Sequence, residues 1–228
     1  MERSGNHAAR YGPDIPGERE LRLLGDLKGK RVLELGCGTG QASIAFARQG
    51  ATAIAVDTSA TRLAEARRLA EQEEARVEWH HGDLADLAFL RADSIDVCFS
   101  AYALAEVEDV NRQFRQVHRV LRPHGIFAFS YQHPMALCVE REHAPDEGAA
   151  LPLGDLVVRR SYFDDAPIAD ERGGETVVVH PRTVSDVFVA LGRTGFRVDA
   201  ILEPRPTGAE TMPLVPSTIV WRARKEGM

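Results

Sequence analysis

The sequence predicts an α/β fold, in which a mostly parallel seven-stranded sheet carries helices on both faces and a long insertion precedes the last helix. The first observation is that short apolar runs alternate with amphipathic helical segments through residues 31–130, an order typical of a parallel sheet. The second is a pair of apolar runs, at residues 196–202 and 217–223, that would close the sheet. The third is the stretch 134–180, which is too long for an ordinary loop. With 228 residues, 44% of them hydrophobic, the chain suits a single domain, 1–228.

The chain is expected to begin with a flexible arm and a short helix. Residues 1–15 are mostly polar and contain glycine and proline, so we expect no regular structure there. Residues 16–27 place Leu21, Leu24 and Leu27 on one side of an amphipathic helix.

The core of the domain, residues 16–133, is expected to hold five strands and the helices between them. Gly50 would end the first of these helices, and Ser59 is a suitable N-cap for the second. In the third helix Val110, Phe114 and Val117 recur at i, i+4 and i+7, which gives one apolar face. The strands are expected at residues 31–35, 53–56, 76–80, 95–100 and 126–130, and the helices at residues 41–49, 60–75 and 110–121.

The insertion at residues 134–180 reads as a lid over a binding site. It holds four prolines, several glycines and scattered charges, with strand-like pieces at residues 156–160 and 176–179. Residues 181–228 are expected to close the domain with a helix over 181–194 and two strands. The apolar face of that helix would consist of Val184, Val187, Phe188 and Leu191.

Composition and charge exclude several classes of protein. The net charge of −6 argues against a nucleic-acid backbone as partner, and no apolar stretch reaches the roughly 18 residues of a membrane span. The N-terminus has no apolar signal sequence. The three cysteines form no CxxC pair, which favours a reducing cytoplasm, no disulfide framework and no metal site. A small molecule is therefore the expected partner, and the chain is expected to be a monomer or a homodimer.

A glycine-rich turn follows the first strand and opens a helix. Gly36, Gly38 and Gly40 allow positive φ and a close approach to the backbone, and the helix start offers unpaired N–H groups. Asp57 ends the second strand, 21 residues after Gly36, where a carboxylate can hold a ribose diol. Asp83 follows the third strand at the same edge. Each feature alone has a simpler explanation as a tight turn, a helix cap or a turn former, but together they predict a nucleotide site.

These motifs resemble class I S-adenosylmethionine-dependent methyltransferases, whose sheet is Rossmann-like. The run Glu34-Leu35-Gly36-Cys37-Gly38-Thr39-Gly40 resembles the family's E/D-x-G-x-G-x-G motif, and Gly82-Asp83-Leu84 resembles its adenine-binding segment. Residues 121–125, Leu-Arg-Pro-His-Gly, resemble its LRPGG turn, with His124 in place of the first glycine. The resemblance covers residues 20–133 well and 181–223 in outline. A nicotinamide-binding site would instead need a GxGxxG spacing, and here the third glycine comes one residue early.

The resemblance implies S-adenosyl-L-methionine as cofactor and S-adenosyl-L-homocysteine as product. Asp57 would hold the ribose, Asp83 and the Leu84 amide would contact the adenine, and Glu34 would order the turn. Ser100 and Tyr102, after the fourth strand, would line the methionine side. The complete set implied at the cofactor is Glu34, Gly36, Cys37, Gly38, Gly40, Asp57, Thr58, Asp83, Leu84, Ser100 and Tyr102.

The acceptor is expected to be a small molecule that offers an oxygen, nitrogen or carbon nucleophile, an aromatic one included. Ser100-Ala101-Tyr102-Ala103 lacks the turn typical of nucleic-acid amino-methylases, and no cysteine follows a proline as cytosine C5 chemistry requires. Candidate catalytic residues flank the lid, and two aromatic residues within it could stack on a flat acceptor. Each of them has a structural alternative as a loop-ordering or packing group. The catalytic candidates are Tyr131, His133, His180 and Arg182, and the substrate-binding candidates are Tyr162 and Phe163.

Two functions are compatible with these motifs. The favoured one is methyl transfer to a small metabolite. The alternative is a catalytically silent methyltransferase-like module that binds the cofactor as a sensor.

Overall fold

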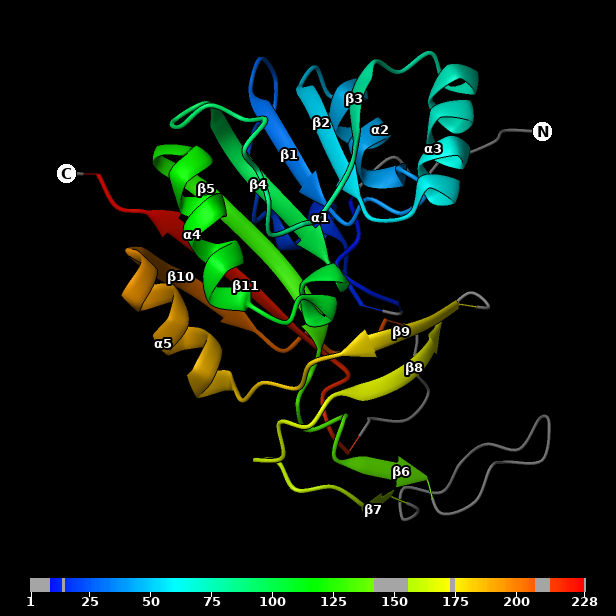
Figure 1. The fold of residues 1–228 in the computed structure, drawn as a ribbon, viewed down its shortest axis with the longest axis vertical. Helices are drawn as coiled ribbons and strands as arrows, with labels where there is room; N and C mark the ends of the chain where they lie inside the picture. Colours follow the sequence, from blue (N-terminus) through cyan, green and yellow to red (C-terminus); the bar gives the residue numbers. More distant parts are fainter. Residues whose placement is uncertain (1–8, 14, 142–155, 173–174, 208–213, 228) are drawn as a thin grey trace.

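The computed structural model describes residues 9–13, 15–141, 156–172, 175–207 and 214–227, and its centre is a seven-stranded sheet (Figure 1). The strand order is β10-β11-β5-β4-β1-β2-β3, and only β11 runs against the other strands. The predicted fold class is therefore confirmed. The strands are β1 (Arg31–Leu35), β2 (Thr52–Asp57), β3 (Val77–His81), β4 (Ile95–Ala101), β5 (Leu121–Gln132), β10 (Phe196–Leu202) and β11 (Thr218–Lys225).

Helices cover both faces of the sheet. One face is covered by α1 (Glu18–Leu21), α2 (Gln41–Arg48), α3 (Ala60–Gln72) and the segment that precedes α1. The other is covered by α4 (Val110–Val120) and α5 (Val184–Thr194), which lie in front of the sheet in Figure 1. The short 3-10 helix η1 (Ala103–Glu106) follows β4 at the carboxyl edge of the sheet. Because parallel strands bury both faces, their apolar residues form near-continuous runs, as the sequence shows.

The N-terminal segment differs from the prediction. In the described part of the expected arm, Ala9, Tyr11 and Ile15 are buried against the core. The helix expected over residues 16–27 is only the four-residue α1. Its end is stabilised by Glu18, whose carboxylate accepts hydrogen bonds from the amides of residues 23 and 24 (3.1 and 2.7 Å) and from the Tyr11 hydroxyl (2.7 Å). Arg22 then turns with φ = 51°, so the leucines beyond it reach the core without a helix.

Strand β5 begins earlier than expected. Leu121 already pairs with Ile95, whereas the next pair is Val97 with Ile126, so residues 122–125 form an irregular bulge within the strand. His124 lies in this bulge with φ = 65°, the left-handed region that glycine occupies at lower cost.

Two hairpins extend beyond the carboxyl ends of the central strands (Figure 1). They are β6 (Val139–Arg141) with β7 (Leu156–Val158), and β8 (Ile168–Arg172) with β9 (Glu175–Val179). β7 and β9 correspond to the two strand-like pieces expected in the lid, and β6 and β8 are their partners. Residues 142–155 of the expected lid lie outside the described residues. In α5, Val187 and Leu191 are buried as expected, but Phe188 is 52% exposed.

In the described ranges, no helix has the length and apolar character needed to cross a membrane.

Candidate cofactor and acceptor site

The three glycines of the turn after β1 differ in their surroundings. All three have positive φ, of 72°, 52° and 79° at Gly36, Gly38 and Gly40. A Cβ on Gly36 would lie 2.0 Å from the Cβ of Ala103, and one on Gly40 would lie 2.5 Å from the Trp79 ring. A Cβ on Gly38 would meet nothing within 4 Å. Gly36 and Gly40 therefore allow close packing, whereas Gly38 borders open space in which a ligand could approach the backbone.

Glu34, on β1 directly before the turn, forms a hydrogen bond to the helix that follows the turn. Its carboxyl group is buried and accepts a hydrogen bond from the hydroxyl of Ser43, in the first turn of α2. Burial raises the pKa of Glu34 to about 8, the Ser43 bond lowers it, and nearby Asp57 raises it further. Glu34 thus links the end of β1 to the helix that follows the turn, in agreement with the ordering role implied by the resemblance.

Asp57 brings the end of β2 to the same turn. Its side chain is buried, one oxygen accepts the Gly38 N–H at 2.7 Å and the other accepts the Ser59 N–H at 2.8 Å. Each carboxylate oxygen has a second lone pair, so the group could still accept two hydroxyl hydrogens. The Cys37 thiol is buried beside it, and burial raises the pKa of this thiol above its usual range, as expected for a structural cysteine.

A second hollow lies beside β3 and brings together Thr58, Asp83 and Leu84. Its volume is about 340 Å³, and acidic residues 106, 108 and 109 line the opposite side. Asp83 accepts the Ala85 N–H at 2.8 Å, which orders the loop. The Leu84 carbonyl accepts a bond of 3.3 Å from the amide of Gln113, a fully buried residue of α4. Sequence reasoning missed Gln113, although a glutamine three residues after Val110 interrupts the apolar face of that helix.

Ser100 and Tyr102 support the corner after β4. The Ser100 hydroxyl is fully buried and donates to the carbonyl of Leu35 at 2.8 Å, which joins β4 to β1. The Tyr102 hydroxyl lies 2.5 Å from the hydroxyl of Thr218 on β11, and Tyr102 has φ = 65°. Both side chains therefore bond within the protein at the edge of the site. Thr218 is separated from Tyr102 by 116 residues, so no local sequence pattern indicated this pair.

His133 forms its hydrogen bonds within the protein at the end of β5. Its ring is buried, Nδ1 accepts the Met135 N–H at 3.1 Å, and Nε2 lies 2.9 Å from a carboxylate oxygen of Glu203. Because Nδ1 accepts, Nε2 carries the hydrogen and donates it to Glu203. In this arrangement neither nitrogen has an available lone pair, which favours the loop-ordering alternative for His133 over the role of general base. It anchors the loop after β5 to the loop after β10 instead.

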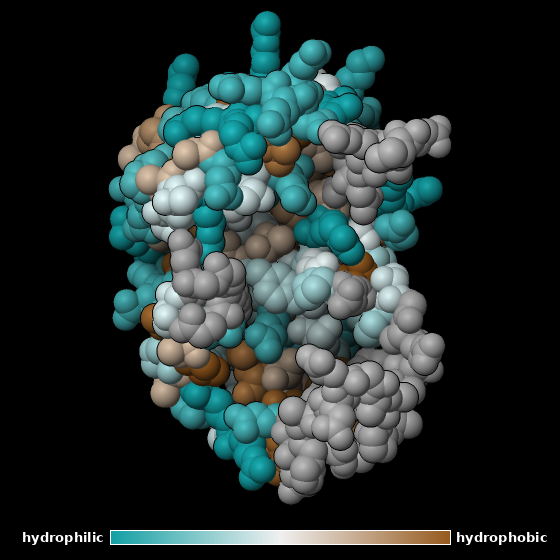
Figure 2. Space-filling model, turned by 90° about the vertical axis from the view of Figure 1, so that its right-hand side faces the viewer, coloured by the Kyte–Doolittle hydropathy of each residue, from teal (hydrophilic) through white to brown (hydrophobic). Residues whose placement is uncertain are grey.

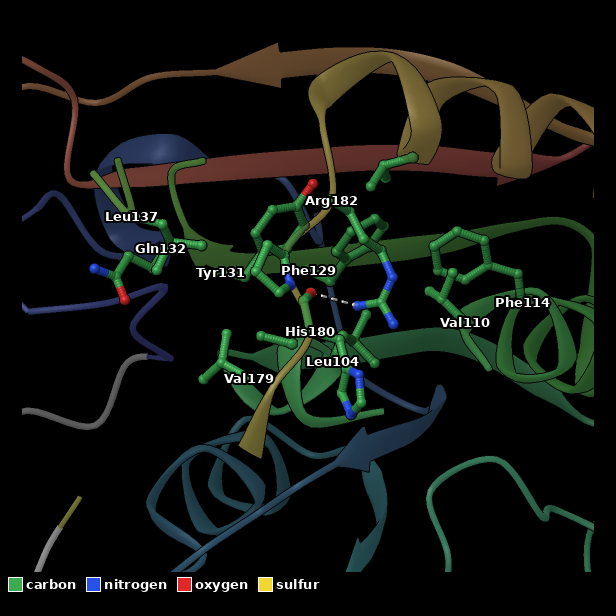
Figure 3. Close-up of a pocket in the computed structure, with 13 residues that line it drawn as sticks. Leu104, Val110, Phe114, Phe129, Tyr131, Gln132, Leu137, Val179, His180 and Arg182 are labelled. Atoms are coloured by element: carbon green, nitrogen blue, oxygen red, sulfur yellow. Dashed lines mark hydrogen bonds between the residues drawn. The ribbon is translucent and has the colours of Figure 1, made fainter. Parts of the chain in front are cut away.

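The other catalytic candidates meet around a small cavity between η1, β5 and the end of β9 (Figure 3). The cavity has a volume of about 20 Å³ and a mostly apolar wall that includes Leu104, Phe114 and Phe129. Tyr131, His180 and Arg182 also line it. Figure 2 shows the hollowed side of the molecule between the core and the lid, where apolar side chains are visible in the recess.

Arg182 and His180 connect the lid to η1 and α4. The His180 N–H donates to the Ala105 carbonyl at 2.8 Å. The Arg182 guanidinium donates to the carbonyls of Val107, Glu108 (3.0 Å) and His180 (3.1 Å). Figure 3 shows the imidazole of His180 beside Leu104. In the described part of the chain this ring has no hydrogen-bond partner, so it is available to a ligand.

Tyr162 and Phe163 lie away from this cavity. The Tyr162 hydroxyl accepts the Val184 N–H at 3.1 Å and so holds the lid to the start of α5. Phe163 packs edge-on against the Tyr162 ring and is 82% exposed. In this arrangement Tyr162 anchors the lid, and neither ring forms part of the cavity wall.

The chain is similar in sequence and structure to known methyltransferases. Residues 33–129 match a family model described as a methyltransferase domain. The chain is 30% identical to an S-adenosylmethionine dependent methyltransferase from Mesorhizobium loti, with a TM-score of 0.74 over 90% of this chain and 96% of that chain.

Two curated relatives match about half of the chain. A malonyl-[acyl-carrier protein] O-methyltransferase from Pectobacterium atrosepticum is 36% identical over 50% of this chain and 43% of its own length. A ubiquinone biosynthesis O-methyltransferase from Azorhizobium caulinodans is 32% identical over 49% of this chain and 44% of its own length. The chain thus spans less than half the length of these two relatives.

Proposed function

The chain belongs to the class I S-adenosylmethionine-dependent methyltransferases, and from this premise we propose that it transfers a methyl group to a small-molecule acceptor bound between η1, β5 and the lid. One observation carries the proposal: the short helix η1 borders both the glycine turn and the cavity beside the lid. Ala103 packs against Gly36 on one side, while Leu104 and Ala105 line the cavity on the other. A cofactor held by the turn and an acceptor held by the lid would therefore both lie against this short helix and could meet at its edge.

The residues at the carboxyl edge fit S-adenosylmethionine. Gly38 leaves open space at the turn, Asp57 retains lone pairs for the ribose hydroxyls, and the 340 Å³ hollow at Leu84 accommodates an adenine. When bound, the cofactor supplies a methyl group on a positively charged sulfur, which is the electrophile of the reaction. The contribution of the protein is to align the acceptor atom, to exclude water and to accept a proton where the acceptor carries one.

His180 is the residue best placed for the acceptor side. It lines the cavity, its backbone is fixed to η1, and its ring is available. An imidazole can take a proton from a hydroxyl or orient it near neutral pH. Both curated relatives are named O-methyltransferases, which supports an oxygen nucleophile. Tyr131 supports the cavity wall, since its hydroxyl is buried beneath the site and burial raises its pKa far above the usual range.

The proposal is tested by two measurements on the same protein. Calorimetry should show binding of S-adenosylhomocysteine, and incubation with methyl-labelled S-adenosylmethionine and a metabolite extract should give labelled product. His180→Ala should lower the transfer rate by about 10²-fold with little change in S-adenosylhomocysteine affinity. The control is His124→Ala, at the opposite end of β5, which should transfer normally. Binding without transfer from any extract would favour the silent sensor module instead.

A further inference from the structure

We propose that the acceptor carries a carboxylate group and that Arg182 binds it at the rim of the apolar cavity. This inference rests on the proposed methyl transfer and names the chemical class of its substrate. It starts from a charge that the fold does not neutralise.

Arg182 is a half-buried cation that forms no ion pair with a carboxylate of the described residues. In the residues that the structure describes, no carboxylate oxygen lies within 4 Å of its guanidinium, and its bonds go only to the carbonyls of His180, Val107 and Glu108. The nearest acids, Asp109 and Asp186, are already used as helix caps, since Asp109 accepts the Arg112 N–H and Asp186 forms a capping box with Thr183. Burial lowers the pKa of Arg182, as expected for a cation that is only partly compensated.

The cavity beside Arg182 offers several hydrogen-bond donors. A guanidinium has five N–H donors, and the bonds to the three carbonyls use three of them. The buried Tyr131 hydroxyl lies next to the indole N–H of Trp221 on β11, and the hydroxyl hydrogen has no acceptor among the described residues. Gln132 and His180 are the other polar residues of the wall, and the remaining residues are apolar. Buried donors without acceptors are costly, so a ligand that supplies acceptor oxygens would stabilise this region.

Size and charge favour a carboxylate over a phosphate. The cavity volume of about 20 Å³ has room for one or two water-sized groups, which suits carboxylate oxygens. A single guanidinium balances one negative charge, whereas a phosphate dianion would keep an unpaired charge in an apolar wall. The body of the acceptor then has space in the wider groove of about 510 Å³ on the other side of Arg182, which shares Val110, His180 and Pro181 with the cavity.

The position of Arg182 would place a bound carboxylate close to His180. Arg182 donates to the backbone carbonyl of His180, so the guanidinium is held close to the residue that carries the imidazole. An acceptor held by its carboxylate would present a neighbouring atom to His180 in a defined orientation. Arg182 would therefore contribute mainly to acceptor affinity rather than to proton transfer.

The test separates acceptors by charge. A metabolite extract is divided by ion exchange into anionic, neutral and cationic fractions, and each is incubated with the wild-type protein and methyl-labelled S-adenosylmethionine. We expect labelled product from the anionic fraction, and we expect phosphatase treatment of that fraction to leave the activity intact.

Arg182→Gln should raise the amount of this fraction needed for half-maximal transfer by at least about tenfold, because a charge-assisted hydrogen bond is lost. Arg182→Lys should lose less, and Arg115→Gln, an exposed arginine on α4, should behave as wild type.

The outcomes are distinguishable. Transfer to the neutral or cationic fraction, or loss of activity after phosphatase treatment, would overturn the inference and leave the methyltransferase function standing. The inference is also overturned if Arg182→Gln binds S-adenosylhomocysteine normally and needs the same amount of the anionic fraction as the wild type for half-maximal transfer. If Arg182→Gln does not fold, the wild-type fractionation and Arg182→Lys still decide. Absence of transfer from every fraction, with S-adenosylhomocysteine still bound, would instead contradict the proposed function.

Discussion

At the scale of single residues, the glycines of the turn are required for different physical reasons. Gly36 and Gly40 could not carry a side chain because Ala103 and Trp79 occupy the space. Gly38 has that space available, and the carboxylate of Asp57 accepts its N–H. The sequence motif shows the three positions as equivalent. Their separate roles depend on neighbours from β3, α3 and η1, which the motif does not contain.

Gly38→Ala is expected to weaken cofactor binding. The new methyl group would enter the open space beside the turn, so affinity for S-adenosylhomocysteine should fall by about tenfold or more, measured by calorimetry. The matched control is Gly29→Ala, which also has positive φ (73° against 52°) and nothing within 4 Å, but lies before β1 and away from the site. Both variants should lose about 1 kcal/mol of unfolding free energy from left-handed backbone strain. Equal S-adenosylhomocysteine affinity in the two would show that Gly38 does not face the ligand.

Glu34→Gln is expected to change how stability depends on pH. Glu34 has a folded-state pKa of about 8, above its ordinary value of 4.5, so its buried carboxyl favours the protonated form. The contribution of Glu34 to the free energy of unfolding is complete below pH 4.5. This contribution is lost as the pH rises toward 8, and the free energy of unfolding then falls by at most about 1.4 kcal/mol per pH unit. Urea unfolding between pH 5 and 9 should therefore show a smaller decline for Glu34→Gln, which can still accept the Ser43 bond. Parallel curves for the two proteins would mean that Glu34 is ionised in the folded state.

At the scale of elements, the helices and strands that follow from apolar periodicity were predicted correctly. Features that depend on contacts between residues distant in the sequence were missed. The strands and long helices of residues 31–120 follow from apolar spacing. The helix expected over residues 16–27 failed because Glu18 caps the chain after one turn, and the expected arm is held by burial of Tyr11. His133 looked like a base because it follows a strand at the carboxyl edge. Its partner Glu203 is 70 residues away, beyond the reach of any local pattern.

His133→Ala is expected to destabilise the protein while leaving cofactor binding intact. The substitution removes the bonds to Met135 and Glu203 and leaves a gap at a buried position, so urea unfolding should show a loss of about 2–3 kcal/mol. Glu203→Gln is the matched comparison, because its carbonyl oxygen can still accept the Nε2 hydrogen, and it should lose less. A His133→Ala protein of normal stability and normal S-adenosylhomocysteine affinity, but without transfer activity, would return His133 to a catalytic role.

At the scale of the whole molecule, the lid and the cofactor core are joined through a few specific bonds. His180 bonds to Ala105, Arg182 bonds to Val107 and Glu108, and Tyr162 bonds to the start of α5. The first two of these reach η1 and the residues directly after it, and Ala103 of η1 packs against the glycine turn at Gly36. The lid strands β8 and β9 contribute Ile168, Val177 and Val179 to the main apolar core. Ligands on either side of η1 can therefore influence the same short segment.

Hydrogen exchange should show this connection as protection that grows with each ligand. S-adenosylhomocysteine alone should slow exchange at the glycine turn and η1, because it covers the first and packs against the second. Adding an acceptor should further slow the amides of β9 and His180, whose N–H is bonded to the Ala105 carbonyl at 2.8 Å, since closure over a ligand reduces local opening. Strand β10, at the far edge of the sheet, is the internal control and should not change. If β9 and His180 exchange equally fast with and without both ligands, the segment is a fixed wall of the acceptor site, and acceptor entry must depend on some other part of the chain.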